Sequence, residues 1–536
     1  MANNDSVLIP YVIQEGSFWY VAYKEKVKVP EIVVSSKGVA NGLSEEYNDG
    51  WDFGPDTYSP TSTSAIPYTQ TGGIMEAWNY AITVYKNIKL MGGLFLIDVP
   101  LEIGSQSGLN SGQQNISIEG AGYMFGLTSP SNQTGATIIQ ISNNFDVSTN
   151  TYMIQIGQPS SIGASQYNGS FGNISLNGIS PNGSNQVQVG IWINNIFDNR
   201  IYNINNPIGA NPSNYLIFQE GFGAATGNAP IIENITSYGC SLHFEPNGEC
   251  LYSNISSDFS GYYDSSTNTV NASLEVGCTS NNGDSGPVMT NVNIWNPDVS
   301  NDQAPAIKLI GGAGTNTTIH GVVIHSPYNN FPIIDASEST TDYDNATTGS
   351  GYFIIDGLSL ESTATAPLIN WGNNTNTGVN ILINGINIPY SNAYPLLVNA
   401  SGNTTPFHIK VVGGIISSGS MPALTSYSLA SGQLFELDGI LYEAGTTSTS
   451  GTTAGTVINK LVAYSPQYKK LILYVNAYEN DSTTNQTIDF PIAFASYAGA
   501  SLNTTGLTIA VATTGITITA PDSTTTYTGI VIVEGY

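Results

Sequence analysis

The stretch TGGIMEAWNYAITVYKNIKLMGGLFLI, residues 71–97, decides the fold. Its first half has apolar residues at helical spacing (Ile74, Trp78, Ala81, Ile82, Tyr85 and Ile88), and Gly92-Gly93 is predicted to end this helix. Its second half, Leu94–Ile97, is a short apolar run typical of a buried strand. A further strand is predicted at residues 115–120. The segment 71–121 therefore predicts one helix followed by closely spaced short strands.

A short strand unit recurs from there to about residue 445, with no second helix between the copies. Each copy joins Asn or Gly to β-branched or other aliphatic residues. Asn and Gly tolerate the left-handed backbone of sharp corners, and alternation sends every second side chain inward. The units begin at Asn173, Asn203, Asn234, Asn254, Asn291, Gly321, Asp356, Asn380, Gly414 and Asp438.

This pattern predicts an all-β chain built on a right-handed parallel β-helix. The helix at its start would be an N-terminal cap that covers unpaired backbone groups at the open end. An array of β-sandwiches remains the alternative at this stage.

The composition changes three times along the chain, which predicts four segments. Residues 1–70 form an N-terminal head, 71–445 the β-helix shaft, and 446–456 a Gly/Ser/Thr linker. Beyond the linker, short strands recur every 10–15 residues, which predicts a C-terminal β-sandwich tip over 457–536.

The charge balance and the distribution of apolar residues argue against several classes of function. The chain has 12 Lys and Arg against 39 Asp and Glu, a formal net charge of −27, so nucleic-acid binding is not expected. No apolar run is long enough to span a membrane, and the first twenty residues show no secretory signal pattern. Arg200 is the one basic residue between Gly92 and Pro305, which disfavours a lyase acting on acidic sugars.

No motif predicts a cofactor or a metal site. Cys240, Cys250 and Cys278 allow at most one internal disulfide, and together with His243 they match no zinc-ligand spacing. Buried thiols stacked along the shaft are the favoured interpretation, and the disulfide state stays open.

Two kinds of residue could carry function on the shaft. A hydrolase for neutral sugars needs two carboxylates facing one groove, and the candidates are Glu220, Glu233, Glu245, Asp258, Asp264 and Asp356. No pair among them can be chosen without the strand register, so no catalytic residue is predicted. Aromatic rings that could stack on sugars are Tyr262, Tyr263, Trp295, Tyr343, Tyr352 and Trp371.

Predicted N-glycosylation acceptors are Asn115, Asn173, Asn234, Asn254, Asn271, Asn316 and Asn503.

Two passages carry a resemblance to a known family. Tyr468-Lys469-Lys470 with the strand after it, the run 486–491 and the terminal run 529–535 resemble the C-terminal domain of fibre-like virion proteins from viruses of hyperthermophilic archaea. The segment 48–120 is similar to the first turns of the pectin-lyase-like β-helix in such proteins and in bacteriophage tailspikes.

The resemblance implies a virion spike or fibre, usually a homotrimer, on the outside of the particle. Its expected partners are further copies of itself, other virion proteins, and a host-surface glycan, S-layer or pilus. Residues 1–70 would attach to the virion, by analogy alone. A tailspike glycosidase that cleaves a neutral host polysaccharide is the alternative function.

Overall fold

The computed structural model covers the 536-residue chain, and its described part comprises the shaft strands, the N-terminal cap and most C-terminal strands. The described residues are 7–15, 18–26, 31–36, 53–54, 69–104, 113, 115–123, 135–157, 168–194, 199–207, 209, 211–220, 230–246, 250–258, 262–264, 269–278, 285–295, 304–311, 316–325, 332–336, 352–360, 368–371, 379–388, 396–399, 406–417, 423–425, 432–443, 456–465, 468–478, 486–489, 497–503, 508–513, 515–519 and 527–535.

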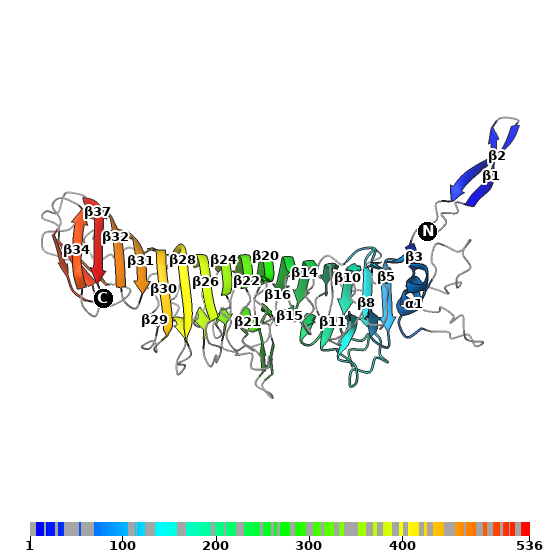
Figure 1. Ribbon diagram of the computed structural model, residues 1–536, viewed down its shortest axis with the longest axis horizontal. Helices are drawn as coiled ribbons and strands as arrows, with labels where there is room; N and C mark the ends of the chain where they lie inside the picture. The colour runs from blue at the N-terminus through cyan, green and yellow to red at the C-terminus, as the bar shows by residue number, and fades with distance from the viewer. Residues whose placement is uncertain are drawn as a thin grey trace.

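The body of the molecule is a parallel β-helix, as the repeat predicts (Figure 1). From β8 to β30, apart from the hairpin of β17 and β18, successive strands alternate between two sheets, so each turn of the chain adds one strand to each. The short-strand sheet contains, in spatial order, β6 (Leu101–Ile103), β9 (Tyr152–Ile156), β11 (Val189–Asn194), β13 (Tyr215–Glu220), β15 (Ser241–Glu245), β19 (Leu274–Cys278), β21 (Ile307–Gly311), β23 (Ile334–Asp335), β25 (Ile369–Asn370), β27 (Leu396–Asn399) and β29 (Ala423–Thr425).

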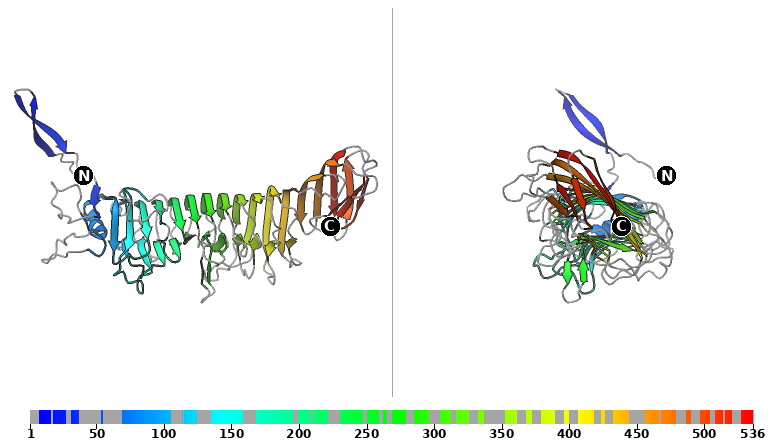
Figure 2. Two further views of the ribbon diagram at one scale, coloured as in Figure 1. Left: turned by 180° about the vertical axis from the view of Figure 1, so that it is seen from behind. Right: turned by 90° about the vertical axis from the view of Figure 1, so that its left-hand side faces the viewer.

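The long-strand sheet forms the rest of the shaft. The right-hand view of Figure 2 looks along the shaft axis. Its parallel strands are β10 (Ser170–Asn177), β12 (Arg200–Asn205), β14 (Ile231–Tyr238), β16 (Leu251–Asp258), β20 (Ser285–Trp295), β22 (Asn316–His325), β24 (Tyr352–Leu360), β26 (Val379–Ile388), β28 (Phe407–Ser417) and β30 (Gln433–Glu443). At its N-terminal end this sheet also takes in β3 (Glu31–Val34), β4 (Asn87–Leu90), β5 (Gly93–Ile97), β7 (Ile118–Glu119) and β8 (Thr137–Ile141).

Each long strand turns a corner at one residue with positive φ. In β10 to β20 that residue is an asparagine with φ between 53° and 58° (Asn173, Asn203, Asn234, Asn254 and Asn291). From β22 onward the same register position is glycine (Gly321, Gly357, Gly385, Gly413 and Gly439). Both residue types adopt left-handed backbone at low cost, which explains why they recur beside the apolar strands.

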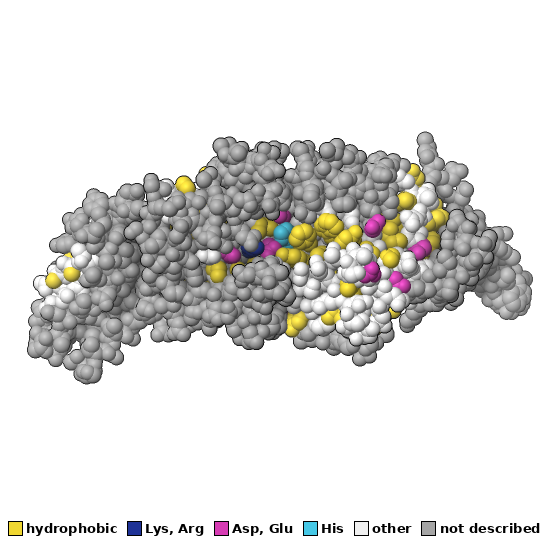
Figure 3. All heavy atoms as spheres, turned by 90° about the horizontal axis from the view of Figure 1, so that it is seen from below, with side chains coloured by type: hydrophobic (Ala, Val, Ile, Leu, Met, Phe, Trp, Pro, Cys, Tyr) yellow, Lys and Arg dark blue, Asp and Glu magenta, His cyan; other side chains and the backbone are white. Residues whose placement is uncertain are grey.

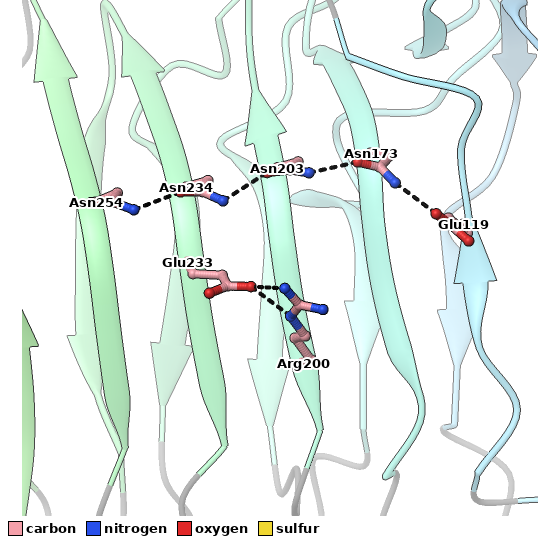
Figure 4. A network of polar contacts seen from close by, with 7 residues as sticks. All are labelled: Glu119, Asn173, Arg200, Asn203, Glu233, Asn234 and Asn254. Atoms are coloured by element: carbon pink, nitrogen blue, oxygen red, sulfur yellow. Dashed lines mark hydrogen bonds and ion pairs between the residues drawn. The ribbon is translucent and has the colours of Figure 1, made fainter.

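The corner asparagines form a ladder of side-chain hydrogen bonds (Figure 4). Asn203 donates to Asn173 at 2.6 Å, Asn234 to Asn203 at 2.9 Å, and Asn254 to Asn234 at 2.8 Å. Asn291 continues the ladder to Asn254 at 2.7 Å, and at the other end Asn173 donates to Glu119 at 2.9 Å. Each amide thus satisfies its neighbour, which locks the register of consecutive turns.

The bore is filled by aliphatic side chains stacked turn upon turn. Ile174, Ile204, Ile235, Ile255 and Val292 follow the corner asparagines directly, and each is at most 1% exposed. Because every inward position repeats in the next strand, one hydrophobic core runs along the whole shaft.

The helix α1 (Ile74–Val84) closes the N-terminal end, with Ile74, Ala77, Trp78 and Ala81 fully buried. It is shorter than predicted: it ends at Tyr85, which has a φ of 57°, and not at Gly92-Gly93. Ile88 lies in β4, because residues 87–90 pair with β3 and β7 instead of continuing the helix.

Part of the predicted head belongs to the first turn of the shaft. β3 pairs with β4 in parallel, and Phe53 forms backbone hydrogen bonds with Val33 and Ser35. Phe53 is 5% exposed and packs into the same core as α1. β1 (Val7–Glu15) and β2 (Phe18–Lys26) form an antiparallel hairpin before it.

The C-terminal strands are antiparallel. β31 (Thr456–Ser465) pairs with β30, and β32 (Tyr468–Tyr478), β37 (Tyr527–Gly535) and β34 (Tyr497–Asn503) extend that sheet. A second sheet contains β33 (Gln486–Asp489), β36 (Gly515–Thr519) and β35 (Thr508–Val511). Ile516 and Val533, one from each sheet, are buried in a common core, as a sandwich requires. The predicted linker lies, except for Thr456, outside the described residues.

Candidate functional site

A continuous row of functional side chains crosses the short-strand sheet on the face turned away from the bore. The strand register aligns Gln155, Trp192, Phe218, His243, Glu275, Lys308, Asp335 and Asn370 on eight consecutive strands, β9 to β25. Adjacent strands lie about 4.8 Å apart, so neighbours in the row can touch. Figure 3 shows this face, where hydrophobic side chains lead to a histidine with acidic and basic side chains beside it.

His243 is the centre of the row. Its Nδ1 lies 2.7 Å from Glu275 Oε2, and its Nε2 lies 3.4 Å from Glu245 Oε2. Glu275 also accepts hydrogen bonds from the Tyr215 hydroxyl at 3.1 Å and from the Ala272 backbone N–H at 3.2 Å. His243, Glu245 and Glu275 are each less than 9% exposed, and so is Lys308.

The charge states of this cluster follow from its contacts. Burial alone would lower the pKa of His243, but hydrogen bonds and charge from Glu245 and Glu275 overcome it and raise the pKa to about 9. Burial would likewise raise the pKa of Glu275, but His243 lowers it, with help from Lys308 and Tyr215. At neutral pH the row therefore carries an imidazolium beside an ionised carboxylate.

Aromatic rings continue the row on the N-terminal side. Phe218 stacks on the His243 ring with centroids 4.2 Å apart and planes 21° apart. The Tyr215 ring contacts the rings of both Phe218 and His243. The ring centroids of Tyr152 and Trp192 lie 5.1 Å apart. These four aromatic residues are half-buried, so each leaves part of its surface accessible. The result is an aromatic platform next to a charged, hydrogen-bonding cluster.

Such a surface is suited to binding sugars. Aromatic faces pack against the C–H faces of pyranose rings, and the half-buried Tyr215 hydroxyl, which donates to Glu275, can accept a hydrogen bond from a sugar hydroxyl. Glu275 is poorly suited to be a general acid, because its lowered pKa keeps it ionised.

The aromatics predicted to contact glycans are scattered. Trp295 is 43% exposed on β20 and Tyr352 is 44% exposed on β24, both in the long-strand sheet. Tyr262 and Tyr263 lie in the hairpin of β17 (Tyr262–Asp264) and β18 (Thr269–Asn271), and Tyr343 lies outside the described residues. The structure corrects the prediction for Trp371, which is fully buried against Phe407 in the core and cannot reach a ligand.

One predicted carboxylate, Glu245, belongs to the site. Glu233 instead pairs with Arg200 on the long-strand sheet (Figure 4), and Asp356 pairs with His320 at 2.8 Å. Asp258 lies beside Trp295 in the strand register. Glu220 is next to Glu245 in register, and Asp264 lies in the β17–β18 hairpin.

Sequence reasoning did not select His243 and Lys308 as site residues, nor Glu275, Trp192, Phe218, Tyr152 and Tyr215. The alternation in Leu242–Glu245, Leu274–Val276 and Ile307–Leu309 does place His243, Glu275 and Lys308 on the outward side. Their alignment on neighbouring strands could not be read from their unequal spacing.

The predicted glycosylation acceptors differ in how accessible their side chains are. In Asn173, Asn234 and Asn254, the amide nitrogen that would carry a glycan is the donor of the corner ladder. Asn271 is 6% exposed, whereas Asn115 is exposed on the surface. The side chains of Asn316 and Asn503 are outside the described part.

Cys240 and Cys250 are buried thiols, and burial raises the pKa of Cys240 to about 12. Among the described residues no group of three or more His, Cys, Asp or Glu is arranged to hold a metal ion. In that same part of the chain, no helix has both the length and the apolar character needed to cross a membrane.

No family model matches the sequence, and no curated protein is significantly similar to it. Several solved structures are similar to the chain at TM-scores below 0.5. The catalytic domain of a GH87 α-1,3-glucanase, solved with nigerose, is 14% identical with a TM-score of 0.42, over 73% of this chain. This chain spans 66% of that domain's length.

Two phage tailspikes are also similar in fold. The gp54 tailspike of Acinetobacter baumannii bacteriophage AP22, solved with a capsular saccharide, is 8% identical with a TM-score of 0.38, over 87% of this chain and 94% of its own. The tailspike gp49 of bacteriophage Fri1, a capsular polysaccharide depolymerase, is 9% identical with a TM-score of 0.33, over 87% and 82%. Similarity at this level concerns the β-helix and carries no conclusion about function.

Proposed function

We propose that this chain is a spike or fibre protein of a virion that binds a host-surface polysaccharide through the outward face of its short-strand sheet. The observation that carries the proposal is the aromatic platform of Tyr152, Trp192, Tyr215 and Phe218 beside the His243–Glu275 pair. A long shaft with such a face suits a protein that must extend from a particle and hold a repeating polymer.

The proposed partners follow from that role. They are further copies of the chain in a homotrimer, other virion proteins at the N-terminal end, and a glycan or glycosylated protein of the host envelope. An origin in a virus of hyperthermophilic archaea is proposed on the resemblance of residues 468–535 and 48–120 alone.

The test is binding of the purified chain to polysaccharide extracted from the host surface, measured by biolayer interferometry. Trp192→Ala is expected to weaken binding about tenfold, because stacking by one aromatic ring contributes on the order of 1–1.5 kcal/mol. The control is Tyr85→Asn, which removes an exposed ring from the cap and leaves a residue that tolerates its positive φ. Equal binding by both variants would contradict the proposed site.

Glycoside hydrolysis is the second candidate, supported by one observation. Glu245 and Glu275 project from the same face of adjacent strands, offset diagonally by two residues, so their Cα atoms lie roughly 8 Å apart. A hydrolase would release reducing ends from the bound polysaccharide, and Glu245→Gln or Glu275→Gln would abolish that release. Binding without release of sugar would leave adhesion as the function.

A further inference from the structure

A second cluster of aromatic and acidic side chains lies on the long-strand sheet, near the end of four consecutive strands. The register aligns Tyr238 of β14, Asp258 of β16, Trp295 of β20 and His325 of β22. These strands belong to a different sheet from His243 and Glu275, so the two clusters occupy different faces of the shaft.

Trp295 differs from the other tryptophans that the structure describes. Trp78 and Trp371 are fully buried and Trp192 is half-buried, whereas Trp295 is 43% exposed. The Trp295 side chain is nevertheless packed, because the His325 ring stacks on its indole with ring centroids 3.5 Å apart and ring planes 12° apart. His325 is itself only 8% exposed, so a buried ring holds an exposed one in a fixed orientation.

Polar groups suited to sugar hydroxyls surround this indole. Asp258 is its register neighbour, and burial, with the charge of Asp258, raises the pKa of Tyr238, whose hydroxyl stays a donor. A second aligned row lies two residues earlier on β14, β16 and β20. It consists of Thr236, Ser256 and Asn293, which are at least partly exposed. Strands β14, β16, β20 and β22 contain no Lys or Arg, so none of these four strands supplies a lysine or arginine to an acidic sugar.

We propose that Trp295, held by His325 and flanked by Asp258, is a second binding site that takes a neutral pyranose residue of a polysaccharide. Trp295 is the stacking residue, Asp258 the hydrogen-bond acceptor, and His325 a positioning residue. The proposal rests on the proposed function for the nature of the ligand, but it uses a separate face and separate residues. Two sites on one shaft would bind a long polymer more tightly than either binds a short oligosaccharide.

The experiment titrates the full chain by calorimetry with neutral hexasaccharides of glucose, mannose or galactose. The wild-type protein is expected to bind two equivalents of one of these probes, and both Trp295→Ala and Trp192→Ala to bind one. Trp295→Phe is expected to restore the second equivalent with weaker affinity, because it keeps an aromatic face. His325→Ala should weaken this site and leave the other unchanged, and Tyr85→Asn should behave as the wild type.

The outcomes separate the two proposals. Two equivalents retained in Trp295→Ala, with an unchanged melting temperature, would overturn the second site and leave the first intact. Loss of an equivalent in Trp295→Ala but not in Trp192→Ala would support the second site and overturn the first. If the wild type binds none of the neutral probes, the neutral-sugar site is overturned, while binding to the host polysaccharide would still support the proposed function.

Discussion

At the scale of single residues, His243 is held between two carboxylates on a surface with few basic groups. Its charge is a consequence of Glu275 and Glu245, since burial alone would favour the neutral ring. The pair has a stabilising role in addition to any role in binding, because breaking a buried ion pair leaves an uncompensated charge.

We predict that His243→Gln destabilises the protein by about 3–5 kcal/mol. The pKa of His243 rises from 6.5 to about 9, so its stabilisation is complete below pH 6.5 and is lost as the pH rises through 9. Glu275, whose pKa is lowered from 4.5, contributes above pH 4.5 and loses its contribution as the pH falls further. Thermal unfolding from pH 4 to 10 should therefore show the largest difference between wild type and variant at pH 4.5–6.5.

His320→Gln is the matched control. The His320–Asp356 pair is 44% and 34% exposed, so its loss should cost no more than about 1 kcal/mol. A difference between wild type and His243→Gln that stays constant from pH 6.5 to 9 would contradict the assigned charge state.

At the scale of elements, the corner residue decides how each long strand bends. Asparagine at this position combines a left-handed backbone with a side chain that bonds the next turn, whereas the glycines from Gly321 onward supply the backbone alone. The ladder therefore reinforces the part of the shaft that carries the cluster around His243 and the cluster around Trp295.

We predict that Asn234→Ala costs about 1–2 kcal/mol more than Asn234→Gly, because alanine adds left-handed backbone strain to the loss of the ladder hydrogen bonds. Melting temperatures of the two variants and the wild type measure this. Equal losses, or a larger loss in the glycine variant, would show that φ at the corner is not the deciding factor.

The cap is a second element with a testable role. Trp78 is fully buried at the end of the bore, so Trp78→Ala should cost about 3–5 kcal/mol. A loosened cap would also expose the first turn of the shaft and promote self-association, which light scattering detects. Tyr85→Asn in the same region should change neither property, and a monodisperse Trp78→Ala protein with normal melting would contradict the capping role.

At the scale of the whole molecule, the chain is an elongated shaft with an antiparallel C-terminal region (Figure 1). The proposed homotrimer predicts a sedimenting mass about three times the 56.6 kDa of one chain. Analytical ultracentrifugation at several concentrations measures it. A single species at the mass of one chain would overturn the trimer.

The β-helix is predictable from the sequence, because its signals are local. Asn-Ile and Gly-aliphatic pairs mark the corners, and alternation beside them marks which side chains fill the bore. The helix end was misplaced, since the apolar spacing that includes Ile88 fits a helix and a strand alike, and only pairing with β3 and β7 decides between them.

The candidate site, in contrast, depends on strand register and is visible only in the folded structure. His243 and Glu275 are 32 positions apart, and Trp192 and Phe218 are 26 apart, yet each pair is in register on adjacent strands. The connecting segments differ in length from turn to turn, so no fixed period reveals which outward residues meet. Local backbone preferences build each turn, whereas hydrogen-bonded register between turns places the side chains that act together.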